Sequence, residues 1–146
     1  QKLLTCWSEG HKAALLYSSR EIGGPRQRPA DPDWGALDYQ LCPRFVYGAL
    51  SAFLETYAGA RFERMLVRTR DAFVGLFSRG GDRLVAAFVT HDGAATFVLQ
   101  TDARAARLVD PMGNARPLAD PASVEVRAGY LLTTLVLEGA TRVDVK

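Results

Sequence analysis

Hydrophobic and polar residues alternate with a period of two through most of the chain after residue 60. This alternation is typical of β-strands that bury one face. Turn-forming residues such as Gly80-Gly81-Asp82 separate most of the alternating segments, and short strands joined in this way predict an antiparallel β-sandwich or barrel. The predicted strands cover residues 60–69, 72–80, 82–90, 94–101, 106–110, 124–129, 130–139 and 142–146.

Residues 1–59 follow a different pattern, which predicts a helix, a strand, a long loop and a second helix. The apolar run 12–19 suits a strand that is buried on both faces. The loop after it holds three of the seven prolines. Segment 43–58 has apolar residues three and four positions apart, which is the spacing of an amphipathic helix. We expect this helix to begin at Pro43 and to end at Gly59.

The composition is that of a globular protein, with 48% hydrophobic and 23% charged residues. A length of 146 residues suits one domain with its own core. The 18 basic and 16 acidic residues give a net charge of +2, which offers no electrostatic reason to expect nucleic acid or a membrane surface as a partner. We expect the chain to be cut from a longer protein, because it enters directly on a helical pattern without an initiator Met.

Two short motifs lie at the second predicted helix. The loop before the helix carries Trp34, Gly35, Leu37 and Asp38, and the helix opens with Pro43, Tyr47, Ala49 and Leu50. This order of a buried strand, a motif-bearing loop, a helix and a β-sandwich resembles the carboxy-terminal end of clan A (β/α)₈ glycoside hydrolases. In that family the eighth barrel strand precedes a loop of the type W/F-G-L-x-D and a helix that opens P-K-P-A-Y-x-A-L. The chain departs from the helix motif at Phe45 and Val46, where the family has Pro and Ala. In addition, Ala36 is inserted in the loop motif, and Arg44 stands in place of Lys in the helix motif.

The resemblance implies an α+β fragment with two parts. Residues 1–59 would be the last strand and helix of a (β/α)₈ barrel, and residues 60–146 an antiparallel β-sandwich of about eight strands. It also implies that the acid/base and the nucleophile, two Glu residues on the fourth and seventh barrel strands, lie upstream of Gln1. Glycoside hydrolysis needs such a facing carboxylate pair, about 5 Å apart for retention. We therefore expect no catalytic residue and no cofactor in this chain, which would work with the missing N-terminal barrel portion on a carbohydrate substrate.

Four residues are candidates for contact with that substrate. Ligands of a (β/α)₈ barrel gather at the carboxyl ends of its strands, where Tyr17, Arg20 and Glu21 would lie. Tyr17 could stack on a sugar face while Arg20 and Glu21 bind hydroxyls, or the charged pair could anchor the loop and Tyr17 belong to the core. Trp34 could line a subsite, or it could plug the mouth of the barrel.

The second helix would connect the two parts. A helix that is buried on two sides needs a broad apolar stripe. We expect Leu50 and Tyr57 to face the sandwich. The opposite, barrel-facing side would consist of Phe45, Val46, Ala49, Phe53 and Leu54.

An alternative function is that of a non-catalytic carbohydrate-binding or interaction module. Such a sandwich normally displays several exposed aromatic residues on one face. After residue 60 the aromatic residues apart from Phe62 fall in strongly apolar runs, where a place in the core is the simpler interpretation. We therefore favour a structural sandwich. The aromatic residues in question are Phe73, Phe77, Phe88, Phe97 and Tyr130.

Other patterns give little support for a site. His11 and His91 have no partners at metal-ligand spacing, and the acidic residues 31, 33 and 38 are ordinary turn formers that could also bind Ca²⁺. Cys6 and Cys42 form no metal or redox motif, and two free thiols are more expected than a disulfide. The stretch VDPMGNARPL at 109–118 predicts a structural turn before a short strand.

Overall fold

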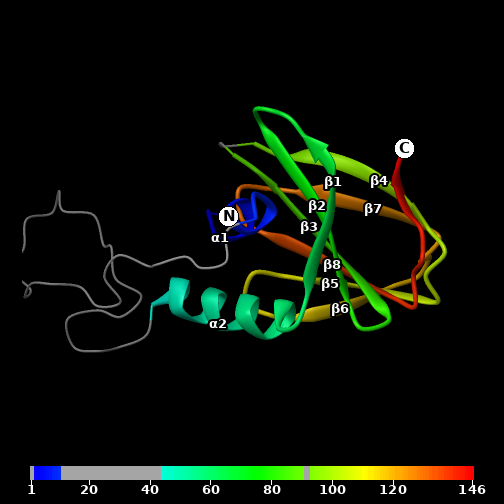
Figure 1. The fold of residues 1–146 in the computed structure, drawn as a ribbon, viewed down its shortest axis with the longest axis horizontal. Helices are drawn as coiled ribbons and strands as arrows, with labels where there is room; N and C mark the ends of the chain where they lie inside the picture. The colour runs from blue at the N-terminus through cyan, green and yellow to red at the C-terminus, as the bar shows by residue number, and fades with distance from the viewer. Residues whose placement is uncertain (1, 11–43, 91–92) are drawn as a thin grey trace, which may run out of the picture.

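A computed structural model describes residues 2–10, 44–90 and 93–146 of the chain. In this part of the chain there are two helices and nine strands. Figure 1 shows the strands as two layers, with both helices near one of them. The helices are α1 (Lys2–Ser8) and α2 (Phe45–Tyr57), and the strands are β1 (Arg61–Arg68), β2 (Ala72–Arg79), β3 (Asp82–Val89), β4 (Ala95–Thr101), β5 (Ala105–Val109), β6 (Ala115–Leu118), β7 (Ser123–Ala128), β8 (Thr133–Glu138) and β9 (Val143–Val145).

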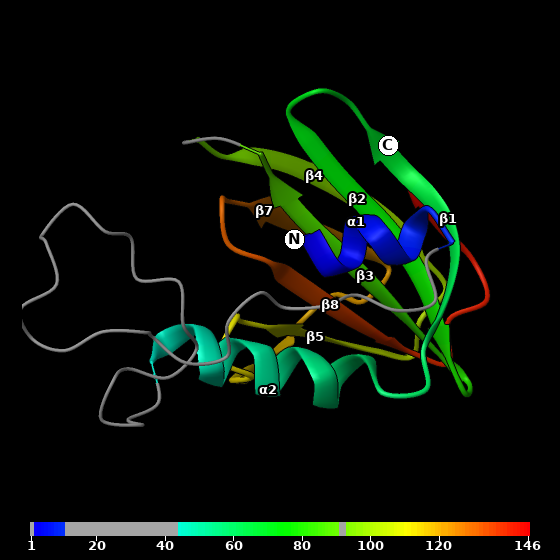
Figure 2. The ribbon, with the colours of Figure 1, turned by 60° about the vertical axis from the view of Figure 1, so that its left-hand side comes forward.

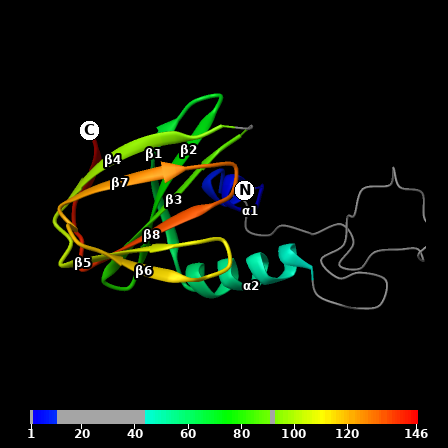
Figure 3. The same cartoon turned by 180° about the vertical axis from the view of Figure 1, so that it is seen from behind.

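The strands form two antiparallel sheets, as the period-two pattern predicts. The larger sheet has the order β1-β2-β3-β8-β5-β6, and the smaller sheet has the order β7-β4-β9. The β2–β3 hairpin turns through Gly80 and Gly81, with Arg79 opposite Asp82, and Gly80 takes the positive φ of 59° that such a turn requires. Seen from behind in Figure 3, β4 and β7 lie across the larger sheet.

A hydrophobic core lies between the two sheets. Alternate residues of β2, β3 and β8, among them Val74, Val85 and Leu135, meet residues of β4, β7 and β9 such as Leu99 and Val126. All five side chains are at most 1% exposed. Each such side chain contributes about 1.5–3 kcal/mol when it leaves water, so this core stabilises the contact between the sheets.

The outer face of the larger sheet carries a second cluster, which the two helices cover (Figure 2). Phe77 is fully buried at its centre and contacts Trp7 of α1 and Tyr57 of α2, with ring centroids 5.3 Å away in both cases. The Tyr57 hydroxyl also hydrogen-bonds to Thr134 Oγ1 on β8, at 3.0 Å. Because the larger sheet is covered on both faces, β2 and β3 are buried along most of their length instead of alternating.

Several sequence-based expectations are confirmed or corrected here. Segment 130–139 is strand only over Thr133–Glu138, and β6 adds a strand to the eight predicted, as the turn before it suggested. Helix α2 ends before Gly59, whose φ is 70°. The prediction that Phe53 and Tyr57 lie on opposite sides of α2 is wrong. Their ring centroids are 4.9 Å apart in a stacked arrangement, because residues four apart share a helix face. The predicted strand 12–19 and the loop after it lie outside the described residues, and the division at residue 59 stays a prediction.

Candidate functional site

The four predicted substrate-binding residues, Tyr17, Arg20, Glu21 and Trp34, lie outside the described residues and remain predictions. The same holds for both histidines, for Cys42 and for the acidic residues of the loop. Cys6 in α1 is half-buried and has a free thiol. Across residues 2–10, 44–90 and 93–146, no three His, Cys, Asp or Glu side chains gather where they could hold a metal ion. Neither helix of this part of the chain is long and apolar enough to cross a membrane.

The turn between β5 and β6 is built around Asp110. Its carboxylate accepts hydrogen bonds from the backbone N–H groups of Met112 and Asn114, at 2.8 and 2.9 Å, and from the Asn114 side chain at 2.8 Å. These hydrogen bonds hold the pKa of Asp110 below its ordinary value, and the bond from the Asn114 side chain has the largest effect. Gly113 takes a φ of 87°, which glycine adopts without strain. The predicted structural role of this turn is confirmed.

The same turn reaches helix α2. A Cβ added at Gly48 would lie 2.6 Å from the Cε of Met112, and one added at Gly113 would lie 3.1 Å from the Cβ of Ala52. Small residues on both sides therefore allow the hairpin and the helix to touch at this point. Between this contact and the aromatic residues at the far end of α2, the helix and the sheet stand apart.

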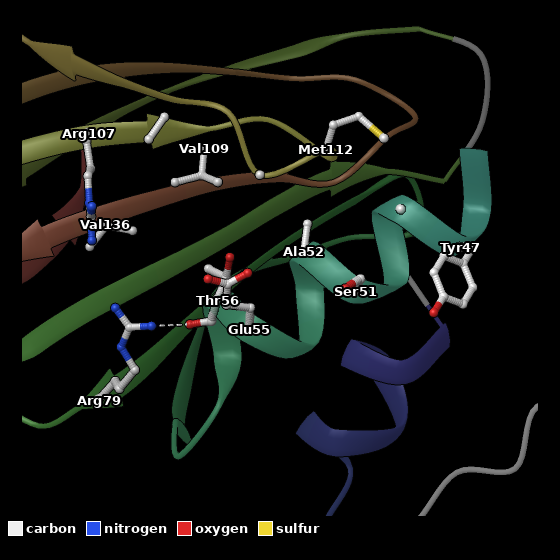
Figure 4. A pocket seen from close by; sticks show the side chains of 13 residues that line it. Tyr47, Ser51, Ala52, Glu55, Thr56, Arg79, Arg107, Val109, Met112 and Val136 are labelled. Atoms are coloured by element: carbon white, nitrogen blue, oxygen red, sulfur yellow. Dashed lines mark hydrogen bonds between the residues drawn. The ribbon is translucent and has the colours of Figure 1, made fainter. Parts of the chain in front are cut away.

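A cavity of about 480 Å³ lies between α2 and the larger sheet at this place (Figure 4). One face of α2 forms its first wall, with Gly48, Ser51, Ala52 and Glu55 three and four residues apart. The opposite wall comes from the β5–β6 hairpin, the end of β2 and the middle of β8. These walls add Tyr47 and Thr56 from α2, Arg79 from β2, Val136 from β8, and Arg107, Val109, Met112, Gly113 and Ala115 from the hairpin.

Two arginines supply the positive charge of the cavity. Arg79 donates a hydrogen bond of 2.5 Å to the backbone oxygen of Thr56, in the last turn of α2. Arg107 has a buried Nε without a hydrogen-bond partner among the described residues. The Oε1 of Glu138 lies 4.0 Å from that Nε, which is too far for a hydrogen bond. The cavity therefore offers guanidinium donors beside an apolar surface of valine side chains.

The described walls of the cavity do not hold a facing pair of carboxylates. Among the described residues, Glu55 is the one carboxylate that lines the cavity, whereas hydrolysis of a glycosidic bond uses a facing pair. What the arrangement can do is bind: guanidinium groups recognise oxyanions, and Ser51 and Glu55 can exchange hydrogen bonds with hydroxyls. Sequence reasoning missed this site. The small residues Gly48, Ser51 and Ala52 on one helix face were the available signal.

Aromatic residues of the two sheets mostly take the predicted place in the core. Phe73, Phe77 and Phe88 are at most 7% exposed, and Phe97 is half-buried. Phe62, which does not lie in a strongly apolar run, is half-buried and packs on Phe77 with ring centroids 5.3 Å apart. Tyr130 was wrongly expected in the core: it is 54% exposed, because β8 begins only at Thr133 and leaves it in the connection from β7.

Two solved structures have folds similar to this one. A family 39 glycoside hydrolase from the gut symbiont Bacteroides cellulosilyticus WH2 matches 73% of the chain with a TM-score of 0.62 and 22% identity. A GH30 endoxylanase from Clostridium papyrosolvens C71 matches 66% of the chain with a TM-score of 0.52 and 13% identity. Both neighbours are glycoside hydrolases. The resemblance predicted from the sequence is thereby confirmed at the level of the fold.

The match covers 22% and 28% of the two neighbouring chains, so the described fold corresponds to a small part of each enzyme. No protein-family model matches the chain, and neither does the sequence of any curated protein. The likeness is thus one of fold, and the activity of the neighbours is not carried over by it.

Proposed function

We propose that this chain is the carboxy-terminal portion of a glycoside hydrolase, in which the two sheets form a structural domain beside a (β/α)₈ barrel. The catalytic carboxylate pair lies elsewhere in that protein. The order of the sequence motifs and the two structural neighbours support this proposal. The small share of each neighbour that the chain covers agrees with it as well.

Helix α2 carries the argument, because it is apolar on more than the face that packs on the sheet. Tyr57 is 3% exposed against the larger sheet, whereas Phe45, Val46 and Leu54 are 57%, 51% and 58% exposed. Two of these residues lie in the first turn of α2, which extends past the sheets in Figures 1 and 3. Large apolar side chains that gather on a surface are typical of a contact with another part of a protein. In the proposed enzyme that part is the barrel.

The alternative, a carbohydrate-binding module, draws less support from the same residues. Its sugar would have to stack on exposed aromatic rings. On the outer face of the larger sheet, Phe73, Phe77 and Phe88 are buried under or beside the helices. Among the strand residues and connections after residue 60 that the structure describes, Tyr130 is the one aromatic residue with more than half of its surface exposed.

The deciding experiment compares the 146-residue chain with a version extended upstream of Gln1 by its natural coding sequence. We expect the short chain to hydrolyse no aryl glycoside and to bind no neutral glycan on an array. The extended protein should hydrolyse glycosides, and a Glu at the end of a strand within one βα unit of Gln1 should be essential for this. Array binding by the short chain that is lost in Tyr130→Ala, but not in Tyr47→Ala, would establish the module instead.

A further inference from the structure

The charged side chains around the cavity beside α2 do not form ion pairs with one another. Arg79, Arg107 and Glu55 all line it, yet Glu55 forms no ion pair with either arginine in the described chain. The described lining residues therefore carry two positive groups and one negative group, a net charge of +1. Buried polar groups in folded proteins almost always have a hydrogen-bond partner, and among these residues the Nε of Arg107 is the group that is buried without a partner in the described part of the chain.

Arg107 shows the need for a partner most directly. Its Nε is buried, and the nearest carboxylate oxygen, on Glu138, is 4.0 Å away. The Arg107 side chain as a whole is 43% exposed, so its outer nitrogens remain accessible. An oxyanion in the cavity would form strong charge-assisted hydrogen bonds with these accessible nitrogens. The guanidinium fork matches a carboxylate in shape as well as in charge.

The other wall residues indicate which chemical groups the rest of such a ligand would carry. Arg79 donates a hydrogen bond to the backbone oxygen of Thr56, which holds a second guanidinium on the sheet side of the cavity, as Figure 4 shows. Ser51 and Glu55 on α2 can accept hydrogen bonds from hydroxyl groups. Val109 and Val136 provide an apolar surface between these polar groups. The volume of about 480 Å³ is within the usual range for small-molecule sites.

We propose that this cavity binds a small polyhydroxylated carboxylate. The carboxylate lies against Arg107 and Arg79, the hydroxyls face Ser51 and Glu55, and the carbon skeleton rests on the two valines. This proposal goes beyond the function proposed above and does not depend on it, since it concerns binding at the helix–sheet junction and involves no hydrolysis.

The test is calorimetric titration of the 146-residue protein with glucuronate as the probe, and with glucose, inorganic phosphate and glycine for comparison. We expect saturable binding of glucuronate below about 10 mM and none of glucose, because glucose lacks the carboxylate. Arg107→Met should weaken binding at least about tenfold, and Arg107→Lys should weaken it less, since lysine keeps the charge without the fork. Ser51→Phe, which fills the cavity from the helix side, should abolish binding.

Arg116→Met is the matched control. Arg116 lies on β6 next to the cavity residue Ala115, is exposed, and points to the opposite face of the strand. Removing its charge should leave glucuronate binding unchanged, and unchanged thermal melts should show that each variant is folded. The proposal is wrong if the natural protein does not bind glucuronate, if Arg107→Met and Arg116→Met behave alike, or if phosphate or glycine binds as tightly as glucuronate.

Discussion

The hydrogen bond between Tyr57 and Thr134 is the most direct test of how α2 is held on the larger sheet. The two hydroxyl oxygens are 3.0 Å apart, and the residues are 3% and 4% exposed. A buried hydroxyl that loses its partner costs about 1–3 kcal/mol, because water cannot replace the bond. Since the ring of Tyr57 keeps its contacts with Phe77 and Trp7, we expect Tyr57→Phe to lower the free energy of unfolding by about 1–2 kcal/mol.

A double-mutant cycle separates this bond from other effects. Thr134→Val keeps the shape of the side chain and should cost about 1 kcal/mol. The double variant should lose about 1 kcal/mol less than the sum of the two single variants, because each single change already breaks the same bond. Tyr47→Phe serves as the control on the same helix: Tyr47 is 48% exposed, and its change should stay within about 0.5 kcal/mol.

Urea denaturation followed by tryptophan fluorescence measures these differences, and Trp7 is a suitable probe because its ring lies 6.3 Å from that of Tyr57. Equal stabilities of Tyr57→Phe and Tyr47→Phe would refute the reasoning. So would additive losses in the cycle, since these would mean that the two hydroxyls do not interact in the folded protein.

Three further predictions concern the same region. Burial raises the pKa of the Tyr57 hydroxyl above its ordinary value of about 10, so the folded state favours the neutral form. The stability that this group contributes should therefore be complete below about pH 10 and fall above it. Urea melts at different pH values should show a smaller fall in Tyr57→Phe. Phe53→Ala should cost about 2 kcal/mol in the same melts, less than the 3–5 kcal/mol of a fully buried Phe, because Phe53 is half-buried; a loss under 0.5 kcal/mol would contradict the stacking on Tyr57. Gly113→Ala should lower stability by about 1–2 kcal/mol, since it puts a side chain at a φ of 87° and 3.1 Å from Ala52, and an unchanged midpoint would show that the turn does not rest on the helix.

Local patterns made the strands predictable from the sequence. Period-two alternation and the Gly80-Gly81 turn are properties of neighbouring residues, and they located β1, β2 and β3 to within one or two residues at most ends. The signal that ends α2 just before Gly59 was equally local, because glycine adopts the positive φ found there without help from distant residues.

Features that depend on distant residues were not predictable in this way. The face of α2 that carries Phe53 was assigned by analogy with a barrel, whereas the partner that it finds is Tyr57 of its own helix. Tyr130 lies in an apolar run, and only the register of β8 against β3 and β5 shows where that run stops being strand. The cavity requires both the helix face of Ser51 and the hairpin of Arg107, which are far apart in the sequence.

Helix α2 takes part in both proposals, since it carries the exposed apolar residues and one wall of the cavity. Contacts with the sheet and with the β5–β6 turn hold it on both sides of the cavity. Its carboxyl end is held by Tyr57 on the sheet, and its amino half touches the β5–β6 turn at Gly48, with the cavity between these contacts. A substitution in the cavity could weaken binding by removing a ligand contact or by moving the helix. The Tyr57–Thr134 coupling distinguishes these cases, because a displaced helix would lose it. Arg107→Met, introduced into each variant of the double-mutant cycle, should therefore weaken glucuronate binding at least about tenfold while leaving the coupling near 1 kcal/mol.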